Sequence, residues 1–142
     1  MKPNKWFNGA TGFLALLFLA AACDQPSAMN ASSANVKHIA QAEFPAEVSQ
    51  FSGPVVVDFY ATWCGPCRRL SPMVDKLADG FAGKIKFVKV NVDESPVLAQ
   101  NYHVEAIPTL IFFKAGKLAD RLTGLPAEAD LKSKLETLAA GK

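Results

Sequence analysis

The sequence predicts a single α/β domain whose mixed β-sheet carries helices on both faces. The chain has 142 residues, which is enough for one domain and a short appendage. Hydrophobic residues make up 50% of it and charged residues 20%, a composition that excludes intrinsic disorder. Strand-like and helix-like stretches alternate from residue 36 onward, which is the order of an α/β fold.

The N-terminus has the layout of a secretory signal. Two lysines lie in the first five residues, and an unbroken apolar stretch over 13–22 ends directly before Cys23. Small residues followed by a cysteine resemble the lipobox of bacterial lipoproteins. We therefore expect residues 1–22 to be a lipoprotein-type signal peptide and Cys23 to be lipidated. The alternatives are cleavage beyond Cys23 and an uncleaved N-terminal signal anchor.

Residues 23–35 are predicted to be a flexible tether, because the stretch 30–35 contains only small and polar side chains. Asp24 resembles the residue that keeps lipoproteins on the inner membrane of some Gram-negative bacteria. We therefore expect an exported domain over 36–142, attached to the inner membrane and facing the periplasm or another extracytoplasmic space. Without the two leader lysines, 13 basic residues balance 13 acidic ones, which argues against a nucleic-acid partner.

The first half of the domain contains the strongest strand signal. A brief strand near 36–39 and a short helix over 43–49 are expected to come first. The run over 55–60 is almost entirely β-branched and aromatic, which is typical of a central strand buried on both faces. Apolar residues at helical spacing then predict a long helix over 67–81, and Pro72 inside it should produce a kink.

The second half is predicted to complete the sheet and to add two helices. Ser95 should cap a short helix that starts at Pro96, because serine accepts hydrogen bonds from the first turn and proline needs no donor there. His103 is expected to take a left-handed backbone conformation at the end of this helix. Gly116 marks a turn between two strands. The elements expected in this half are strand 85–92, helix 95–102, strands 109–113 and 118–123, and helix 127–138.

A Cys-Gly-Pro-Cys sequence at 64–67 lies between the central strand and the long helix. Cysteines three apart in a first helical turn are neighbours, and the unpaired N–H groups at a helix start favour a thiolate. Disulfide exchange needs such a pair, with one sulfur exposed. We therefore interpret Cys64 as the exposed nucleophile and Cys67 as the resolving thiol that releases the product from a mixed disulfide.

Three other interpretations of this cysteine pair are weaker. Structural zinc would need a second pair of ligands, and only Cys23, His38 and His103 are left, at irregular spacing. A c-type haem would need a histidine directly after the second cysteine, where Arg68 stands. A purely structural disulfide would close a loop too small to add much stability. We expect no metal, and no cofactor other than the redox-active disulfide.

Asp58 is the second candidate for chemistry. Desolvation within the apolar run should raise the pKa of its carboxyl group. Strand alternation places it on the face that the long helix covers, near Cys67. We interpret Asp58 as the proton acceptor for Cys67, the alternative being an aspartate that is merely tolerated near a strand end. Lys89 in the neighbouring strand is expected either to pair with Asp58 or to reach solvent.

Residues 57–67 resemble the active-site sequence of the thioredoxin family, and Ile107-Pro108-Thr109 resembles its cis-proline loop. The resemblance covers the whole predicted domain and is highly specific. It implies the thioredoxin fold, with a cis peptide bond between Ile107 and Pro108. Tyr60 departs from the family pattern, since many members have tryptophan there. Further landmarks in family order and spacing are 89–93, 113–117 and Gly124.

The resemblance also implies the activity of a protein-disulfide reductase that alternates between dithiol and disulfide forms. An extended substrate segment would pair with the backbone of Ile107 as an added strand. Disulfides of exported proteins are the expected substrates, a membrane-embedded thiol carrier is the expected electron donor, and the domain is expected to be a monomer. The docking surface around Cys64 would consist of Trp63, Gly65, Pro66, Ile107, Pro108 and Gly124.

The Gly-Pro pair between the cysteines resembles the reducing members of the family, with potentials near roughly −270 mV, rather than the oxidants near roughly −120 mV. We therefore expect a reductant. A net oxidant or an isomerase is one alternative. The other is a membrane-tethered binding or chaperone module that holds chains on the same surface without turnover.

Overall fold

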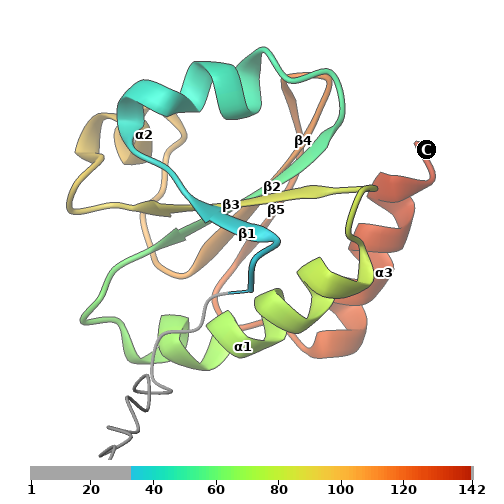
Figure 1. The fold of residues 1–142 in the computed structure, drawn as a ribbon. Coiled ribbons are helices and arrows are strands. Elements are labelled where there is room, and N and C mark those ends of the chain that lie inside the picture. The colour runs from blue at the N-terminus through green and yellow to red at the C-terminus, as the bar shows by residue number, and fades with distance from the viewer. Residues whose placement is uncertain (1–32, 142) are drawn as a thin grey trace, which may run out of the picture. The chain divides into compact units, whose positions relative to one another are not determined.

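A five-stranded mixed sheet forms the centre of the domain (Figure 1), as predicted. The computed structural model describes residues 33–141; the predicted signal peptide, Cys23 and the predicted tether up to residue 32 lie outside the described residues. The strand order is β1-β3-β2-β4-β5. The elements are β1 (Val36–His38), the 3-10 turn η1 (Gln41–Glu43), the π-helical turn η2 (Pro45–Ser49), β2 (Pro54–Tyr60), α1 (Gly65–Gly80), β3 (Lys86–Asn91), α2 (Pro96–Asn101), β4 (Thr109–Lys114), β5 (Lys117–Thr123) and α3 (Glu128–Ala139).

The central strand β2 explains why its sequence is apolar at consecutive positions. It pairs with β3 in parallel and with β4 in antiparallel orientation, so neither edge is free. Its side chains alternate between two cores: Val55, Val57 and Phe59 enter one, and Val56 enters the other. Both faces of the strand are therefore covered, as the sequence run predicted.

Helices cover the two faces of the sheet. Figure 1 shows α1 and α3 on one face, and α2 with the η1 and η2 turns on the other. On the first face the leucines of α1 and α3 pack against the sheet, and Pro72 lies within α1 as predicted. The buried side chains that these two helices contribute are Leu70, Val74, Leu77, Ala78, Leu131, Leu135 and Leu138.

The helix expected over 43–49 is present, but as the π-helical η2 instead of an α-helix. Phe44 has helical backbone angles, and the N–H of Gln50 donates to the carbonyl of Pro45, five residues earlier, at 2.8 Å. The cap predicted at Ser95 was wrong. Ser95 stands directly before α2 but its side chain forms no capping hydrogen bond. Its ψ of 54° lies outside the extended region that a capping residue normally adopts.

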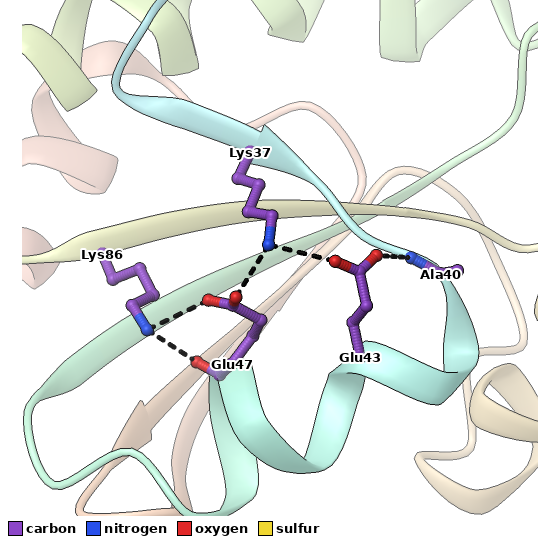
Figure 2. Close-up of polar contacts among 5 residues, drawn as sticks. All are labelled: Lys37, Ala40, Glu43, Glu47 and Lys86. Carbon is purple, nitrogen blue, oxygen red and sulfur yellow. Dashed lines mark hydrogen bonds and ion pairs between the residues drawn. The ribbon is translucent and has the colours of Figure 1, made fainter.

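A network of charged side chains holds the η1 and η2 turns against the sheet (Figure 2). The ammonium group of Lys37 lies 3.0 Å from Glu43 and 2.7 Å from Glu47. Glu47 also accepts from Lys86 at 3.1 Å, and Glu43 accepts from the N–H of Ala40 at 2.9 Å. The hydrogen bonds from Lys37 and Lys86 hold the pKa of the Glu47 carboxyl below its usual value. These groups are partly or fully exposed, so we assign them a modest structural role.

The first described residues contact the end of α1. Ser33 donates a hydrogen bond to the Asp79 carboxylate, and the Asn35 side-chain amide donates to the same oxygen at 2.8 Å. These hydrogen bonds lower the pKa of Asp79. The last residues of the predicted tether therefore lie against the domain, at the end of α1 opposite its first turn. In the part of the chain that the structure describes, no helix is long and apolar enough to cross a membrane.

Candidate active site

Cys64 and Cys67 form a disulfide bond at the start of α1. Cys64 has an extended backbone and occupies the capping position, where its sulfur accepts the N–H of Cys67 at 3.2 Å. Pro66 fits the first turn, since its missing N–H would have no partner inside the helix. In the reduced form, this N–H and the positive end of the helix dipole would stabilise a thiolate on Cys64.

The prediction that Cys64 is exposed was wrong for this disulfide form. Cys64 is 4% exposed and Cys67 is 3% exposed. The two cysteines pack with Ala61 and with Tyr60, and the Cys64 sulfur lies 3.8 Å from the carbonyl oxygen of Ile107. The loop that precedes β4 therefore covers the sulfur, a contact between segments far apart in the sequence.

The predicted docking residues gather around this disulfide. The Ile107–Pro108 peptide bond is cis, as expected, and Ile107 packs against the cysteines. The N–H of Gly124 donates to the carbonyl of Pro108 at 2.8 Å, which brings β5 to the same place. Trp63 is 66% exposed, and its indole N–H donates to the Asp93 carboxylate at 2.9 Å. Sequence reasoning missed Asp93 as the residue that orients this ring, although it lies in a family landmark.

Asp58 is buried in the middle of the sheet, as predicted. It is 2% exposed, and one of its carboxylate oxygens has no hydrogen-bond partner among residues 33–141. Burial raises the pKa of Asp58 from 3.8 to about 6, while the charge of Lys89 opposes this and that of Asp75 adds to it. The carboxyl group is therefore poised to exchange a proton near neutral pH.

Both expectations for Lys89 were wrong. Its side chain is buried, and it forms no ion pair with Asp58 within 4.0 Å in the described part of the chain. The ammonium group instead donates to the hydroxyl of Ser71 at 2.6 Å and lies 3.8 Å from the carboxylate of Asp75. The sequence analysis did not identify Ser71 and Asp75. Their spacing could have indicated them, because Cys67, Ser71 and Asp75 are four residues apart and therefore lie on one side of α1.

Two further polar residues lie at the same side of the sheet. His38 places Nδ1 3.0 Å from the Tyr60 hydroxyl, and the two rings meet edge to face. Burial, followed by the charge of Lys89, lowers the pKa of His38, and burial raises the pKa of Tyr60. His103, in contrast, has φ of 50° directly after α2, so the left-handed cap predicted there is confirmed.

Comparison with known proteins identifies the family. The sequence model of the family described as thioredoxin matches residues 35–137. The chain belongs to the thioredoxin family. It is 45% identical over 98 residues to Thioredoxin 1 of Nostoc sp., which covers 69% of this chain and 92% of that protein. It is 44% identical over 101 residues to Thioredoxin of Pyropia yezoensis, which covers 71% and 94%. Thioredoxin M4, chloroplastic, of Arabidopsis thaliana is 42% identical over 106 residues, 75% of this chain and 55% of that protein.

The chain is therefore a thioredoxin-type thiol–disulfide oxidoreductase, and the predicted thioredoxin fold is confirmed. Its redox group is contained in the protein, as the disulfide between Cys64 and Cys67. Among residues 33–141 there is no group of three or more histidine, cysteine, aspartate or glutamate side chains that could hold a metal ion. The individual roles of the site residues and the domain boundaries stay predictions.

Proposed function

We propose that this thioredoxin-type enzyme reduces disulfides of exported proteins through a mixed disulfide with Cys64. The observation that carries the proposal is the position of Cys64 at the start of α1, with the backbone N–H of Cys67 on its sulfur. That position stabilises the thiolate, which is the attacking species in disulfide exchange. The buried Asp58 supplies the proton acceptor that the second step needs.

The two steps balance in electrons and protons. The Cys64 thiolate attacks one sulfur of the substrate disulfide; a bond forms between Cys64 and that sulfur, and the other substrate sulfur leaves as a thiolate. Asp58 takes the proton of the Cys67 thiol, and the Cys67 thiolate attacks the Cys64 sulfur. The second substrate sulfur then leaves as a thiolate. The proton that Asp58 holds and one proton from solvent convert the two substrate thiolates into a dithiol. Two electrons have passed to the substrate, and the enzyme holds the Cys64–Cys67 disulfide.

The substrate is expected to bind to the surface that Trp63 and the Ile107–Pro108 loop form beside the disulfide. Trp63 offers an exposed apolar ring beside Cys64, in a position set by Asp93. The backbone of Ile107 next to the cis Pro108 is available to pair with an extended segment. Both features favour an unfolded or flexible protein chain as the substrate. The remaining residues proposed for this surface are Gly65, Pro66 and Gly124.

The reducing direction is tested by the equilibrium potential of the Cys64–Cys67 couple. We expect roughly −270 mV when the purified protein is equilibrated with glutathione buffers of known ratio, because Gly-Pro lies between the cysteines. A difference of about 150 mV corresponds to about 7 kcal/mol for two electrons, so the potential decides the direction. A value of roughly −120 mV would favour the net oxidant instead.

A reductant outside the cytoplasm needs electrons from across the membrane, and we propose a membrane-embedded thiol carrier as donor.

The proposed membrane attachment is tested at the mature N-terminus. We expect mass spectrometry of the protein purified from bacterial membranes to show a chain that begins at Cys23 and carries a diacylglyceryl group on its sulfur. The Cys23→Ser variant should lack the lipid. A mature chain that begins beyond Cys23, or one that retains the leader, would contradict the lipoprotein and leave secretion or a signal anchor in its place.

A further inference from the structure

A polar stripe on α1 faces two charged residues of the sheet. Cys67, Ser71 and Asp75 are spaced four residues apart, so they lie along one side of the helix. Asp58 on β2 and Lys89 on β3 are direct partners in the parallel register. Paired residues of neighbouring strands point to the same face, and Lys89 reaches Ser71 and Asp75, so this is the face that α1 covers.

The ammonium group of Lys89 could bond to Asp58 on the neighbouring strand or to side chains of α1 on this face. Neighbouring strands lie about 5 Å apart, so a lysine side chain is long enough to reach the carboxylate beside it. The ammonium group nevertheless bonds to Ser71 at 2.6 Å and lies 3.8 Å from Asp75. The Asp58 carboxylate keeps an oxygen without a partner among the described residues, although it is buried. Contacts from α1 therefore decide where the lysine points.

The partner of the Lys89 ammonium group affects how readily Asp58 accepts a proton. An ammonium group in contact with a carboxylate favours its ionised form and makes it a weaker proton acceptor. An ammonium group kept at a distance still moderates the energy of burying the carboxylate, but leaves its oxygens open to a thiol proton. The second arrangement is the one that the structure contains.

We propose that Ser71, with Asp75 beside it, is a positioning residue of the redox centre: it holds the Lys89 ammonium group away from Asp58 and so keeps this carboxylate free to accept the proton of Cys67. The inference rests on the proposed role of Asp58 as proton acceptor. It assigns a function to a hydroxyl group that does not touch the reacting sulfurs.

Other groups face the same region, and none replaces Ser71. His38 on β1 pairs in register with Lys89 and bonds to the Tyr60 hydroxyl. From β4, Leu110 lies opposite Asp58, and it is apolar. The buried side chains of α3 are leucines. The charged groups that act on Asp58 are thus Lys89 and Asp75. Burial, followed by the charges of Glu94 and Asp58, raises the pKa of Tyr60, and Lys89, Asp75 and Glu94 act on His38.

The test is the titration of the Asp58 carboxyl by ¹³C NMR in the full-length, oxidised protein, in which the cysteines do not titrate. In Ser71→Ala the lysine loses its 2.6 Å partner and should turn to Asp58, so the titration midpoint should fall by about one pH unit, a tenfold loss of proton affinity. Lys89→Met should raise the midpoint. Ser133→Ala, which removes an exposed hydroxyl from α3, is the matched control and should leave it unchanged.

The decisive measurement combines the variants. If Ser71 acts through Lys89, then Ser71→Ala introduced into Lys89→Met should not move the midpoint at all. An equal shift in both backgrounds, an unchanged midpoint in Ser71→Ala alone, or a rise in place of a fall would overturn the inference. The titration midpoint is measured without turnover, so this test does not depend on the proposed function. Failure of the proposed function would appear separately, as a rate of mixed-disulfide release that does not depend on Asp58.

Discussion

Replacing Cys64 by serine is expected to reduce the rate of insulin-disulfide reduction to the uncatalysed background. A serine hydroxyl is not ionised near neutral pH, so neither the N–H of Cys67 nor the helix dipole can convert it into a nucleophile. The measurement is the appearance of insulin turbidity in the presence of dithiothreitol, with wild-type protein and the variant at equal concentration.

Replacing Cys67 by serine is the informative control for this experiment. It leaves the Cys64 thiolate able to attack but removes the sulfur that resolves the intermediate. In the insulin assay we expect turnover to stop. When the reduced variant is mixed with insulin in the absence of dithiothreitol, a stable mixed disulfide should accumulate, visible as a mass adduct that added dithiothreitol removes. Equal activity of wild type and Cys64→Ser, or no activity in either, would contradict the enzyme and favour the tethered binding module.

The Asp58→Asn variant is expected to be about 3 kcal/mol more stable than the wild type at pH 8. Burial raises the pKa of Asp58 from 3.8 to about 6, so the folded protein binds this proton more tightly than the unfolded chain does. The carboxyl group therefore contributes stability that is fully present below pH 3.8 and is lost as the pH rises through about 6. The amide has no charge to desolvate, so it avoids this loss.

Urea unfolding of both proteins at a series of pH values measures the effect. The difference in the free energy of unfolding should be large at pH 8 and should shrink toward zero near pH 4. Asp79→Asn near the end of α1 is the control, because this carboxylate is exposed and hydrogen bonds from Ser33 and Asn35 lower its pKa. Any pH-dependent difference in its stability should therefore have the opposite sign. A stability difference for Asp58→Asn that does not change with pH would contradict a buried, titrating carboxyl group.

The same variant should lose catalytic speed while it gains stability. The amide that Asp58→Asn introduces cannot accept the proton of Cys67, so release of the mixed disulfide is expected to slow by roughly tenfold to a hundredfold, while its formation by Cys64 changes little. Rapid-quench kinetics with a labelled substrate disulfide separate the two steps. If formation alone became slower, Asp58 would not be the proton acceptor for Cys67.

Much of the site could be predicted from the sequence because its chemistry is local. The start of α1 brings Cys64 and Cys67 together within one turn, and the apolar run of β2 buries Asp58 wherever that strand lies in a sheet. A prediction that depends on one backbone position can still fail. Ser95 directly precedes α2, as predicted, but its side chain forms no capping hydrogen bond, because its ψ of 54° lies outside the extended region.

The amino-acid sequence by itself determined the order of strands and helices, the position of the cysteine pair at a helix start and the burial of Asp58, since each depends on residues close together in the chain. Only the tertiary structure decided that the Ile107 loop covers Cys64 and that Lys89 bonds to Ser71 in place of Asp58. The physical reason is that the surroundings of a long lysine side chain or of a cysteine sulfur depend on the element that packs against it. That element, a helix or a loop from another part of the chain, is brought there by the fold.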